Sequence, residues 1–339
     1  MVYTSPSSAA TLKTAERERS TTASPKWGRP VATFALALIG VWLLLYAAYV
    51  MLPFIRPGSD IIARAKFDTL VKRPMFGAQD RFRLMIFGHS KVLTSVRPRE
   101  LDAAMGPGFR SYNLGLPGDD RFLPILEDAL LAGNVPTHVL LTAPWGSKLD
   151  TDGVLDTLRN DAATANFLVP FRQLPRDATL FVFQNKNRMM DAIREVDAER
   201  SAMIDDRGWY FIKSQSHYAD DRLPNDYALP TDRPTQIEQR KIPDTSISRP
   251  RLEQLARKYG FKVIMIPLPY RIGEYAPAPA SDRTRLATIS NEPPIYVLGP
   301  DYFSYPPALF SDPSHMNADG ALVYTADLAR LLRTSGVFD

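Results

Sequence analysis

Three side chains that lie far apart in the sequence could together carry out nucleophilic chemistry. Ser90 follows an apolar run in "RLMIFGHSKVLTSV" (83–96), directly after a glycine and a histidine. Asp312 and His315 lie close together in "SDPSHMN" (311–317). A serine nucleophile needs a base within hydrogen-bond reach, and that base needs an acid to orient it. We therefore predict that Ser90, His315 and Asp312 form one hydrogen-bonded triad.

The choice of His315 as the base follows from the positions of the chain's four histidines. His138 begins an apolar run, at the end of the predicted strand that is far from such a site, and His217 lies in an irregular segment. His89 adjoins Ser90, but the side chains of successive residues leaving a strand diverge. His315 remains, and in a tight loop the carboxylate of Asp312 can reach its imidazole N–H.

Each of these residues also has a structural interpretation. Ser90 could be the N-cap of the helix that follows it, a role that serine often fills. Asp312 and His315 could be polar loop residues bonded to the backbone. The segment after them, from residue 318 to 333, has helical spacing of its apolar residues, and Asn317 is in position to cap that helix.

Composition and charge exclude several classes of function. The chain has 339 residues, of which 45% are hydrophobic, and no cysteine, so thiol catalysis, thiolate metal sites and disulfides are excluded. Residues 1–30 carry five basic and two acidic residues, which leaves 36 basic and 35 acidic residues for the remainder. A nearly neutral body lacks the basic face that nucleic-acid binding requires, so we expect no nucleic-acid partner. We expect neither a metal ion nor a cofactor.

One segment has the length and composition of a membrane anchor. The 22 residues from Val31 to Leu52 contain no charge, and at about 1.5 Å per residue they span a hydrocarbon core of roughly 30 Å. The run is too long for a signal peptide and lacks a good cleavage site; a buried core helix is the alternative. We predict a disordered tail over 1–30, a transmembrane anchor over 31–54 and a linker over 55–80. Lysine and arginine are equally frequent on both sides, so the positive-inside rule does not orient the anchor.

The remainder, 81–339, reads as one α/β domain. Short apolar runs at 83–87, 110–114, 138–143, 262–267 and 295–299 alternate with helical segments, which predicts a parallel sheet covered on both faces. One such helix is 249–260, which Gly260 can close. Residues 150–248 break the alternation. They are predicted to be an insertion, helical in its first half, that lies beside or over the site.

Three short blocks in this domain resemble those of the SGNH (GDSL-type) hydrolase superfamily. "FGHS" (87–90) resembles the first block, with His89 where the family usually has aspartate. "YNLGLPGDD" (112–120) resembles the second block. Its Gly118 matches the family glycine whose backbone N–H forms the oxyanion hole together with the backbone N–H of the serine, here Ser90. "SDPSHMN" resembles the fifth. The resemblance implies a flavodoxin-like SGNH three-layer sandwich with a central parallel sheet, preceded here by one transmembrane helix.

The third block departs from the family pattern. "LLTAPWGSKLD" (140–150) stands where the family usually has Gly-x-Asn-Asp, so one oxyanion donor is missing or is replaced by Trp145 or Ser147. Removing one such donor can cost a factor of about 10²–10³ in rate. Gly118 also has the alternative of serving only a turn, and Trp145 that of packing.

Membrane-anchored proteins of this kind resemble those that acetylate or deacetylate bacterial exopolysaccharides and those that assist D-alanylation of cell-wall polymers. The resemblance implies a serine O-acyltransferase or carbohydrate acetylesterase in the inner membrane, with its catalytic domain in the periplasm. Its partners would be a polysaccharide and a membrane-bound acyltransferase or glycan synthase complex. The aromatic and acidic residues of "GWYF" (208–211) and "SHYADD" (216–221) suit carbohydrate, or else form a self-packed lobe.

Two other functions stay open from the sequence. A lipase or thioesterase would surround the serine with apolar loops, whereas "GDDRF" (118–122) and "SDPSH" (311–315) are polar. A catalytically inactive SGNH-like scaffold or glycan-binding subunit would explain the altered third block.

Overall fold

The computed structural model describes residues 28–55, 58–117, 122–142, 167–211, 216, 218–227, 248–272, 288–299 and 303–339. The chain divides into two compact units, Met1–Met51 and Leu52–Asp339. The described part of the first unit is a single helix, and the second unit contains every strand that the structure describes.

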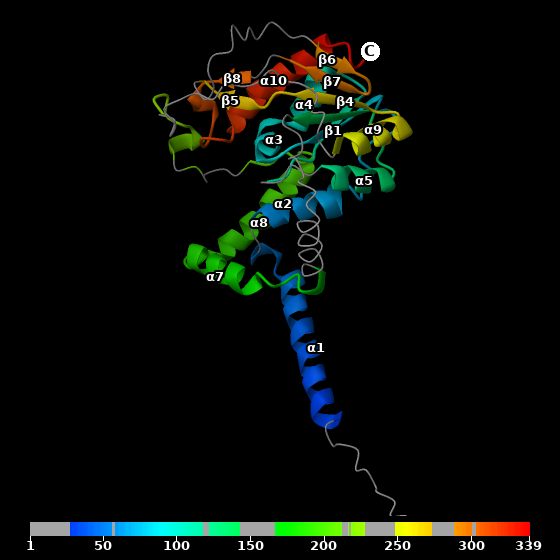
Figure 1. Cartoon of the computed structure of the whole chain (residues 1–339). Coiled ribbons are helices and arrows are strands. Elements are labelled where there is room, and N and C mark those ends of the chain that lie inside the picture. The colour runs from blue at the N-terminus through cyan, green and yellow to red at the C-terminus, as the bar shows by residue number, and fades with distance from the viewer. Residues whose placement is uncertain are drawn as a thin grey trace, which may run out of the picture. The chain divides into compact units, whose positions relative to one another are not determined.

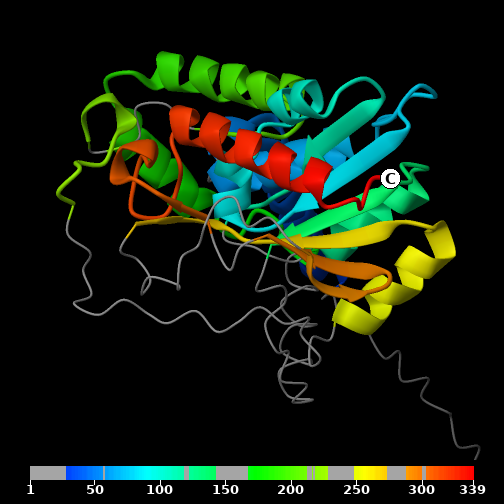
Figure 2. The same cartoon turned by 90° about the horizontal axis from the view of Figure 1, so that it is seen from above.

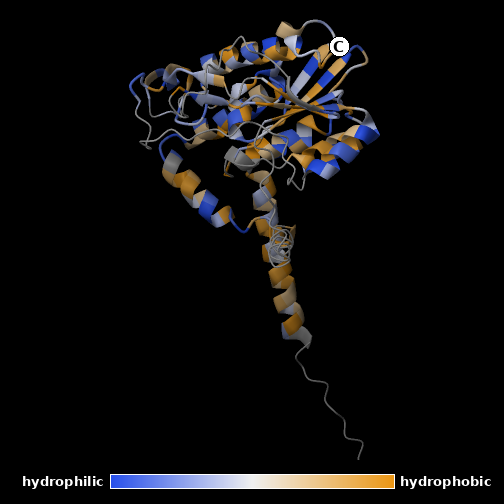
Figure 3. Cartoon of the chain, turned by 45° about the horizontal axis from the view of Figure 1, so that its top comes forward, coloured by the Kyte–Doolittle hydropathy of each residue, from blue (hydrophilic) through white to orange (hydrophobic). Residues whose placement is uncertain are grey.

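The helix of the first unit, α1 (Gly28–Met51), covers most of the predicted anchor, 31–54, but begins and ends three residues earlier. Its first residues, 28–30, were expected to belong to a disordered tail; the rest of that predicted tail, 1–27, lies outside the described residues. Its segment Pro30–Met51 is long and apolar enough to cross a membrane, and Figure 3 shows it as an almost uniformly hydrophobic helix. Large apolar side chains such as Phe34, Leu36 and Leu44 are exposed to more than 60%. Exposed apolar side chains on every turn are expected of a helix that is surrounded by lipid rather than by a protein core.

The second unit is built on a six-stranded sheet in the order β2-β1-β3-β4-β7-β6 (Figure 1). Five neighbouring strands are parallel, and β6 runs antiparallel to β7. The strands are β1 (Phe82–Phe87), β2 (Phe109–Asn113), β3 (His138–Thr142), β4 (Lys262–Ile266), β6 (Thr288–Glu292) and β7 (Ile295–Leu298). The five parallel strands are the five apolar runs predicted from the sequence. Numbered by their order in the chain, the five parallel strands lie side by side as 2-1-3-4-5. The direction in which strands are added therefore reverses between β1 and β3. Ligands of such sheets bind near this point, at the carboxyl ends of the strands.

Helices cover both faces of this sheet, as near-continuous apolar strands require. The helices α3 (Ser90–Ser95), α4 (Pro98–Met105) and α10 (Ala318–Thr334) cover one face, where Leu84, Ile86 and Ile264 are buried. The helices α5 (Leu123–Leu131) and α9 (Ser248–Tyr259) cover the other, over Met85, Val139 and Val263. Figure 2 shows α10 in red and α9 in yellow on opposite sides of the strands.

The ends of the two predicted helices are set by local signals. Asn317 caps α10, because its Oδ1 accepts a hydrogen bond from the backbone N–H of Gly320 at 2.9 Å. Gly260 follows α9 with a φ of 74°, the left-handed conformation that favours glycine after a helix. Both ends were predicted from the sequence.

The segment that we expected to be a linker, 55–80, is largely part of the second unit. It forms α2 (Gly58–Arg64) and a π-helix, η2 (Ala65–Leu70), after a 3₁₀ turn, η1 (Pro53–Ile55). Its side chains at Ile62, Leu70 and Val71 are buried. Sequence inspection missed these elements because they are short and alternate apolar with charged residues.

The described part of the insertion is helical in its first half, as predicted. It contains α7 (Leu174–Asn185), α8 (Met189–Asp205) and the short turn η3 (Ala219–Asp221). Met203 of α8 packs with Ile62, Ala65 and Leu93, so this part of the insertion rests on α2, η2 and α3.

A second, two-stranded sheet was not predicted. It pairs β5 (Pro269–Arg271) with β8 (Phe303–Tyr305), and η4 (Pro307–Leu309) follows it. β5 comes two residues after β4, so this small sheet continues the chain beyond the carboxyl end of the large one. Strands of three residues carry too little periodicity to be recognised from sequence alone.

Candidate active site

Ser90 lies at the carboxyl end of β1, as the first residue of α3. The turn between strand and helix is formed by Gly88, where a Cβ atom would lie 2.4 Å from Val92 Cγ2 and 2.7 Å from Thr142 Oγ1. Only glycine fits there. The close approach lets α3 start immediately at the strand end, next to the point where the strand order reverses.

The cap of α3 is His89 and not Ser90. The Nδ1 atom of His89 accepts a hydrogen bond from the backbone N–H of Lys91 at 3.3 Å. Through this bond His89 acts as the N-cap, the role that aspartate or serine fills in other helices. This finding contradicts the structural interpretation of Ser90 as the cap, and the Ser90 hydroxyl makes no hydrogen bond within the described part of the chain.

Asp312 and His315 form the predicted pair. The distance from Asp312 Oδ2 to His315 Nδ1 is 2.7 Å. The other carboxylate oxygen, Oδ1, accepts hydrogen bonds from the backbone N–H groups of Ser314 (2.7 Å) and His315 (2.9 Å). The loop is closed by a β-bridge between Phe310 and Met316. The carboxylate therefore holds both the loop and the imidazole ring, and among the described residues the Nε2 atom of His315 has no hydrogen-bond partner.

The electrostatics of this pair keep Asp312 ionised. Burial by itself would raise the pKa of the carboxyl, but the hydrogen bonds from the His315 ring and from the backbone of Ser314 and His315 outweigh burial and hold the pKa of Asp312 below its ordinary value. An ionised carboxylate on Nδ1 orients the imidazole and stabilises its protonated form, which is what a general base needs.

Ser90 and His315 lie at the same edge of the sheet. Helices α3 and α10 are joined by Thr325, whose hydroxyl donates to the carbonyl of Ser95 at 3.3 Å and accepts from the backbone N–H of Arg97 at 3.0 Å. The far end of α10 reaches the amino end of β3, where Val337 O accepts from His138. Both helices therefore begin at the carboxyl edge. The structure brings Asp312 and His315 into contact, whereas no hydrogen bond joins His315 to Ser90 within the described residues.

The described second half of the insertion lies against the histidine loop. The Ser216 hydroxyl donates to the carbonyl of Ser311, and the backbone N–H of Leu223 donates to the carbonyl of Phe310 at 2.9 Å. Asn317 Nδ2 donates to the carbonyl of Asp221 at 3.0 Å. Beside these contacts is a depression of about 450 Å³, lined by Phe211, Asp220, Asp221, Arg222, Asn317, Ala318 and Asp319.

The "GWYF" stretch has mainly a structural role. The Trp209 indole N–H donates to the carbonyl of Thr94 at 2.8 Å, and the guanidinium of Arg97 lies over its ring at 4.6 Å. Tyr210 is buried and donates to Glu199. Of this stretch, Phe211 lines the depression. Trp209 and Tyr210 make contacts within the second unit, as the alternative of a self-packed lobe expects.

The loop after β2, which leads to the proposed oxyanion glycine, is held by two residues that the sequence did not single out. Asn113 Nδ2 donates to the carbonyls of Val92 (2.9 Å) and Val96 (2.8 Å), which ties the loop to α3. Lys66 is fully buried, and its Nζ donates to the carbonyls of Asn113 (2.8 Å) and Gly115 (2.6 Å). Gly118, Trp145 and Ser147, the candidate oxyanion residues, lie outside the described residues.

His138 lies at the amino end of β3, the end far from the candidate site, and is a core residue. It is 4% exposed, and its Nε2 donates to Val337 O at 3.2 Å. Burial, the largest effect, lowers the pKa of His138 from 6.5 to about 4, so the ring is neutral at pH 7.

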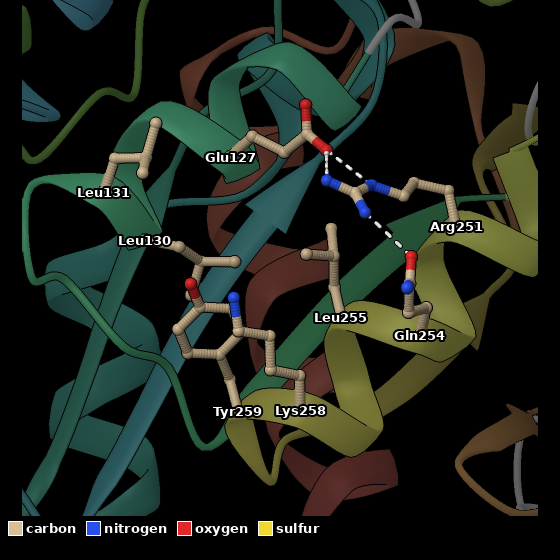
Figure 4. A pocket seen from close by; sticks show the side chains of 8 residues that line it. All are labelled: Glu127, Leu130, Leu131, Arg251, Gln254, Leu255, Lys258 and Tyr259. Carbon is tan, nitrogen blue, oxygen red and sulfur yellow. Dashed lines mark hydrogen bonds and ion pairs between the residues drawn. The ribbon is translucent and has the colours of Figure 1, made fainter.

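A second depression, of about 250 Å³, lies between α5 and α9. Figure 4 shows Arg251 paired with Glu127 across its rim and Leu130 and Leu255 at its base. These helices cover the face of the sheet opposite to α3 and α10. The groove is therefore separate from the Ser90 and His315 edge, and its side chains are those of an ordinary helix–helix contact.

The described residues contain no group of three or more His, Asp or Glu side chains that could hold a metal ion.

The chain was compared with protein-family models, with curated proteins and with solved structures, and it matches none of them.

Proposed function

We propose that this protein is a membrane-anchored, SGNH-like serine acyltransferase or acyl esterase that acts on a bacterial polysaccharide, with O-acetyl as the acyl group. The observation that carries the proposal is the Asp312–His315 pair, 2.7 Å between Oδ2 and Nδ1, in a loop at the same sheet edge at which Ser90 begins α3. A capped helix start at His89 leaves the Ser90 hydroxyl available for chemistry.

The chemistry follows the usual order for a serine nucleophile. Ser90 Oγ attacks the carbonyl carbon of the acyl donor while its proton passes to His315 Nε2, and Asp312 stabilises the resulting imidazolium. The leaving group departs with that proton, and Ser90 carries the acyl group as an ester. A sugar hydroxyl or water then attacks the ester carbon and gives its proton to His315, which returns it to Ser90 Oγ.

The depression beside the histidine loop supports a carbohydrate acceptor. Phe211 offers an aromatic ring, and Asp220, Asp221 and Asp319 offer hydrogen-bond acceptors for hydroxyl groups. A polysaccharide made for export is modified outside the cytoplasm, so the proposal implies that the domain lies in the periplasm with α1 in the inner membrane. A membrane-bound acyltransferase or glycan synthase would be its partner.

The test compares Ser90→Ala with Ser201→Ala, the same change at an exposed position on α8. The wild-type chain in detergent should hydrolyse a small activated acetyl ester slowly, because such esters need little help with the leaving group. Ser90→Ala should abolish this ester turnover. It should also abolish the acetylation or deacetylation of the polysaccharide that occurs in cells carrying the wild-type protein, while Ser201→Ala should leave both activities unchanged.

Asp312→Asn should lower kcat less than Ser90→Ala does, since the carboxylate orients the base but forms no covalent bond. If Ser90→Ala at equal protein level leaves ester turnover and polymer acetylation untouched, the triad is inactive and the chain is a scaffold or a glycan-binding subunit.

A further inference from the structure

Helix α7 and the residues around it present an unusual apolar surface. Most of the exposed large apolar side chains of the described second unit fall in one stretch, 167–190. They are Phe167 (83% exposed), Leu168, Val169, Leu180, Val182, Phe183 (74%), Met189 and Met190 (61%). We name this set the 167–190 patch. Soluble surfaces rarely gather apolar side chains in this way unless something covers them.

Helix α7 carries apolar side chains on its outer face as well as on its inner face. Leu174, Asp177, Ala178 and Phe181 are partly buried at helical spacing, so they form the inner face. The Asp177 side chain is only 11% exposed. The outer face instead carries Leu180, Val182 and Phe183. A surface helix in water carries mainly polar side chains on its outer face, so these three exposed apolar side chains make the outer face of α7 suited to an apolar medium.

Covalent connection brings this patch close to the place where a membrane span would end. The candidate span ends at Met51, and Phe54 follows three residues later, within about 11 Å for a fully extended chain. The Phe54 ring lies 5.4 Å from the ring of Phe181, on the inner face of α7. Wherever α1 enters a bilayer, α7 therefore lies within a short distance of the bilayer surface.

The charges of the stretch match an anionic lipid surface. Residues 167–190 contain Arg172, Arg176, Lys186 and Arg188, and the one acidic residue among them is the inward-facing Asp177. Arg172, Arg176 and Lys186 are exposed. Apolar side chains flanked by exposed basic ones are the composition of helices that lie in the headgroup region of a membrane.

We propose that the 167–190 patch is a second membrane contact, in which α7 lies in the interfacial layer of the bilayer that α1 spans. The contact would hold the second unit at the lipid surface. The position of its candidate active site relative to the membrane would then be constrained by two attachments, α1 and α7, rather than by α1 alone. This inference is independent of the proposed acyl chemistry and depends only on α1 being inserted.

The chain contains no cysteine, which permits a direct test. In the full chain, Phe183→Cys carries a bimane label and is reconstituted in vesicles of phosphatidylethanolamine and phosphatidylglycerol. Leu322→Cys, an exposed apolar position on α10, is the matched control. We expect lipid-borne doxyl groups to quench the label at 183 several-fold more strongly than at 322, and aqueous iodide to show the opposite order.

Two outcomes would overturn the proposal. Equal access of iodide to both labels would show that the patch faces water. Protection of the label at 183 from both quenchers would show that a protein surface covers it. Met190→Cys, also strongly exposed, provides the same readout if Phe183→Cys does not fold, and unchanged ester turnover in either variant separates this result from the test of the triad.

Discussion

Asp312 illustrates how one side chain can shape a loop and prepare a base at once. Its Oδ1 accepts two backbone N–H groups, and its Oδ2 contacts His315 Nδ1. The backbone bonds fix the carboxylate, so the imidazole is oriented by a group that cannot easily rotate away. The polar-loop interpretation is therefore true of this residue and is compatible with the proposed catalytic one, because the loop contacts leave Oδ2 available for the histidine.

His138 gives a prediction about pH at the same scale. Its folded pKa of about 4 lies below the ordinary 6.5, so between these values the unfolded chain binds a proton that the folded chain does not. Stability is therefore full above pH 6.5 and falls as the pH decreases toward 4. The free energy of unfolding should drop by about 2 kcal/mol between pH 7.5 and pH 5, measured by chemical unfolding.

His138→Gln should be less stable than wild type at pH 7.5 yet lose much less stability on acidification, since the titrating ring is gone. The Asp312 carboxyl, whose pKa is lowered, contributes its own loss only below about pH 4, outside this window. An equally steep loss in His138→Gln would assign the acid sensitivity to another group.

At the scale of elements, the position of α3 depends on a segment that belongs to neither the helix nor the sheet. Asn113 joins the β2 loop to the last carbonyls of α3, and Lys66 of η2 holds the same loop from the other side. We therefore expect a change in η2 to affect the helix that begins with Ser90. The segment that follows α1 would then be part of the support of the candidate site.

Lys66→Met should test this support. Methionine fills a similar volume but leaves the carbonyls of Asn113 and Gly115 without their donor, which should destabilise the chain by about 1–3 kcal/mol and lower ester turnover. Lys72→Met, at an exposed ion pair with Asp68, should change stability by less than about 0.5 kcal/mol. Thermal unfolding and kcat of the two variants give the comparison, and equal effects would refute a role for the buried Lys66 amine.

At the scale of the whole molecule, α1 is long and apolar enough to span a membrane, and the proposed polymer chemistry requires the second unit to be exported. A phosphatase that is active only outside the cytoplasm should therefore be active when fused after Asp339. A reporter that works only in the cytoplasm should be inactive at the same junction. The reverse pattern in intact cells would rule out a polysaccharide made for export as the substrate.

Much of this architecture could be predicted from the sequence because the patterns that specify it are local. The five parallel strands are continuous apolar runs, α1 is an uninterrupted apolar helix, and Asn317 and Gly260 mark helix ends by their own side-chain and backbone chemistry. Such features depend on residues within a few positions of one another. The edge strand β6, "TISNE", is polar and was missed, because it is specified by pairing with β7 rather than by its own pattern.

The sequence by itself therefore determined the α/β class, the apolar anchor helix and the Asp312–His315 pair, all of which follow from short-range periodicity and spacing. Tertiary structure alone decided that His89 rather than Ser90 caps α3, that Trp209 packs against α3, and that Lys66 is buried beneath the β2 loop. These outcomes join residues tens to more than a hundred positions apart or depend on which of two adjacent side chains turns toward the helix. Burial and hydrogen bonding between distant segments are fixed only when the whole core is packed, and no local pattern encodes them.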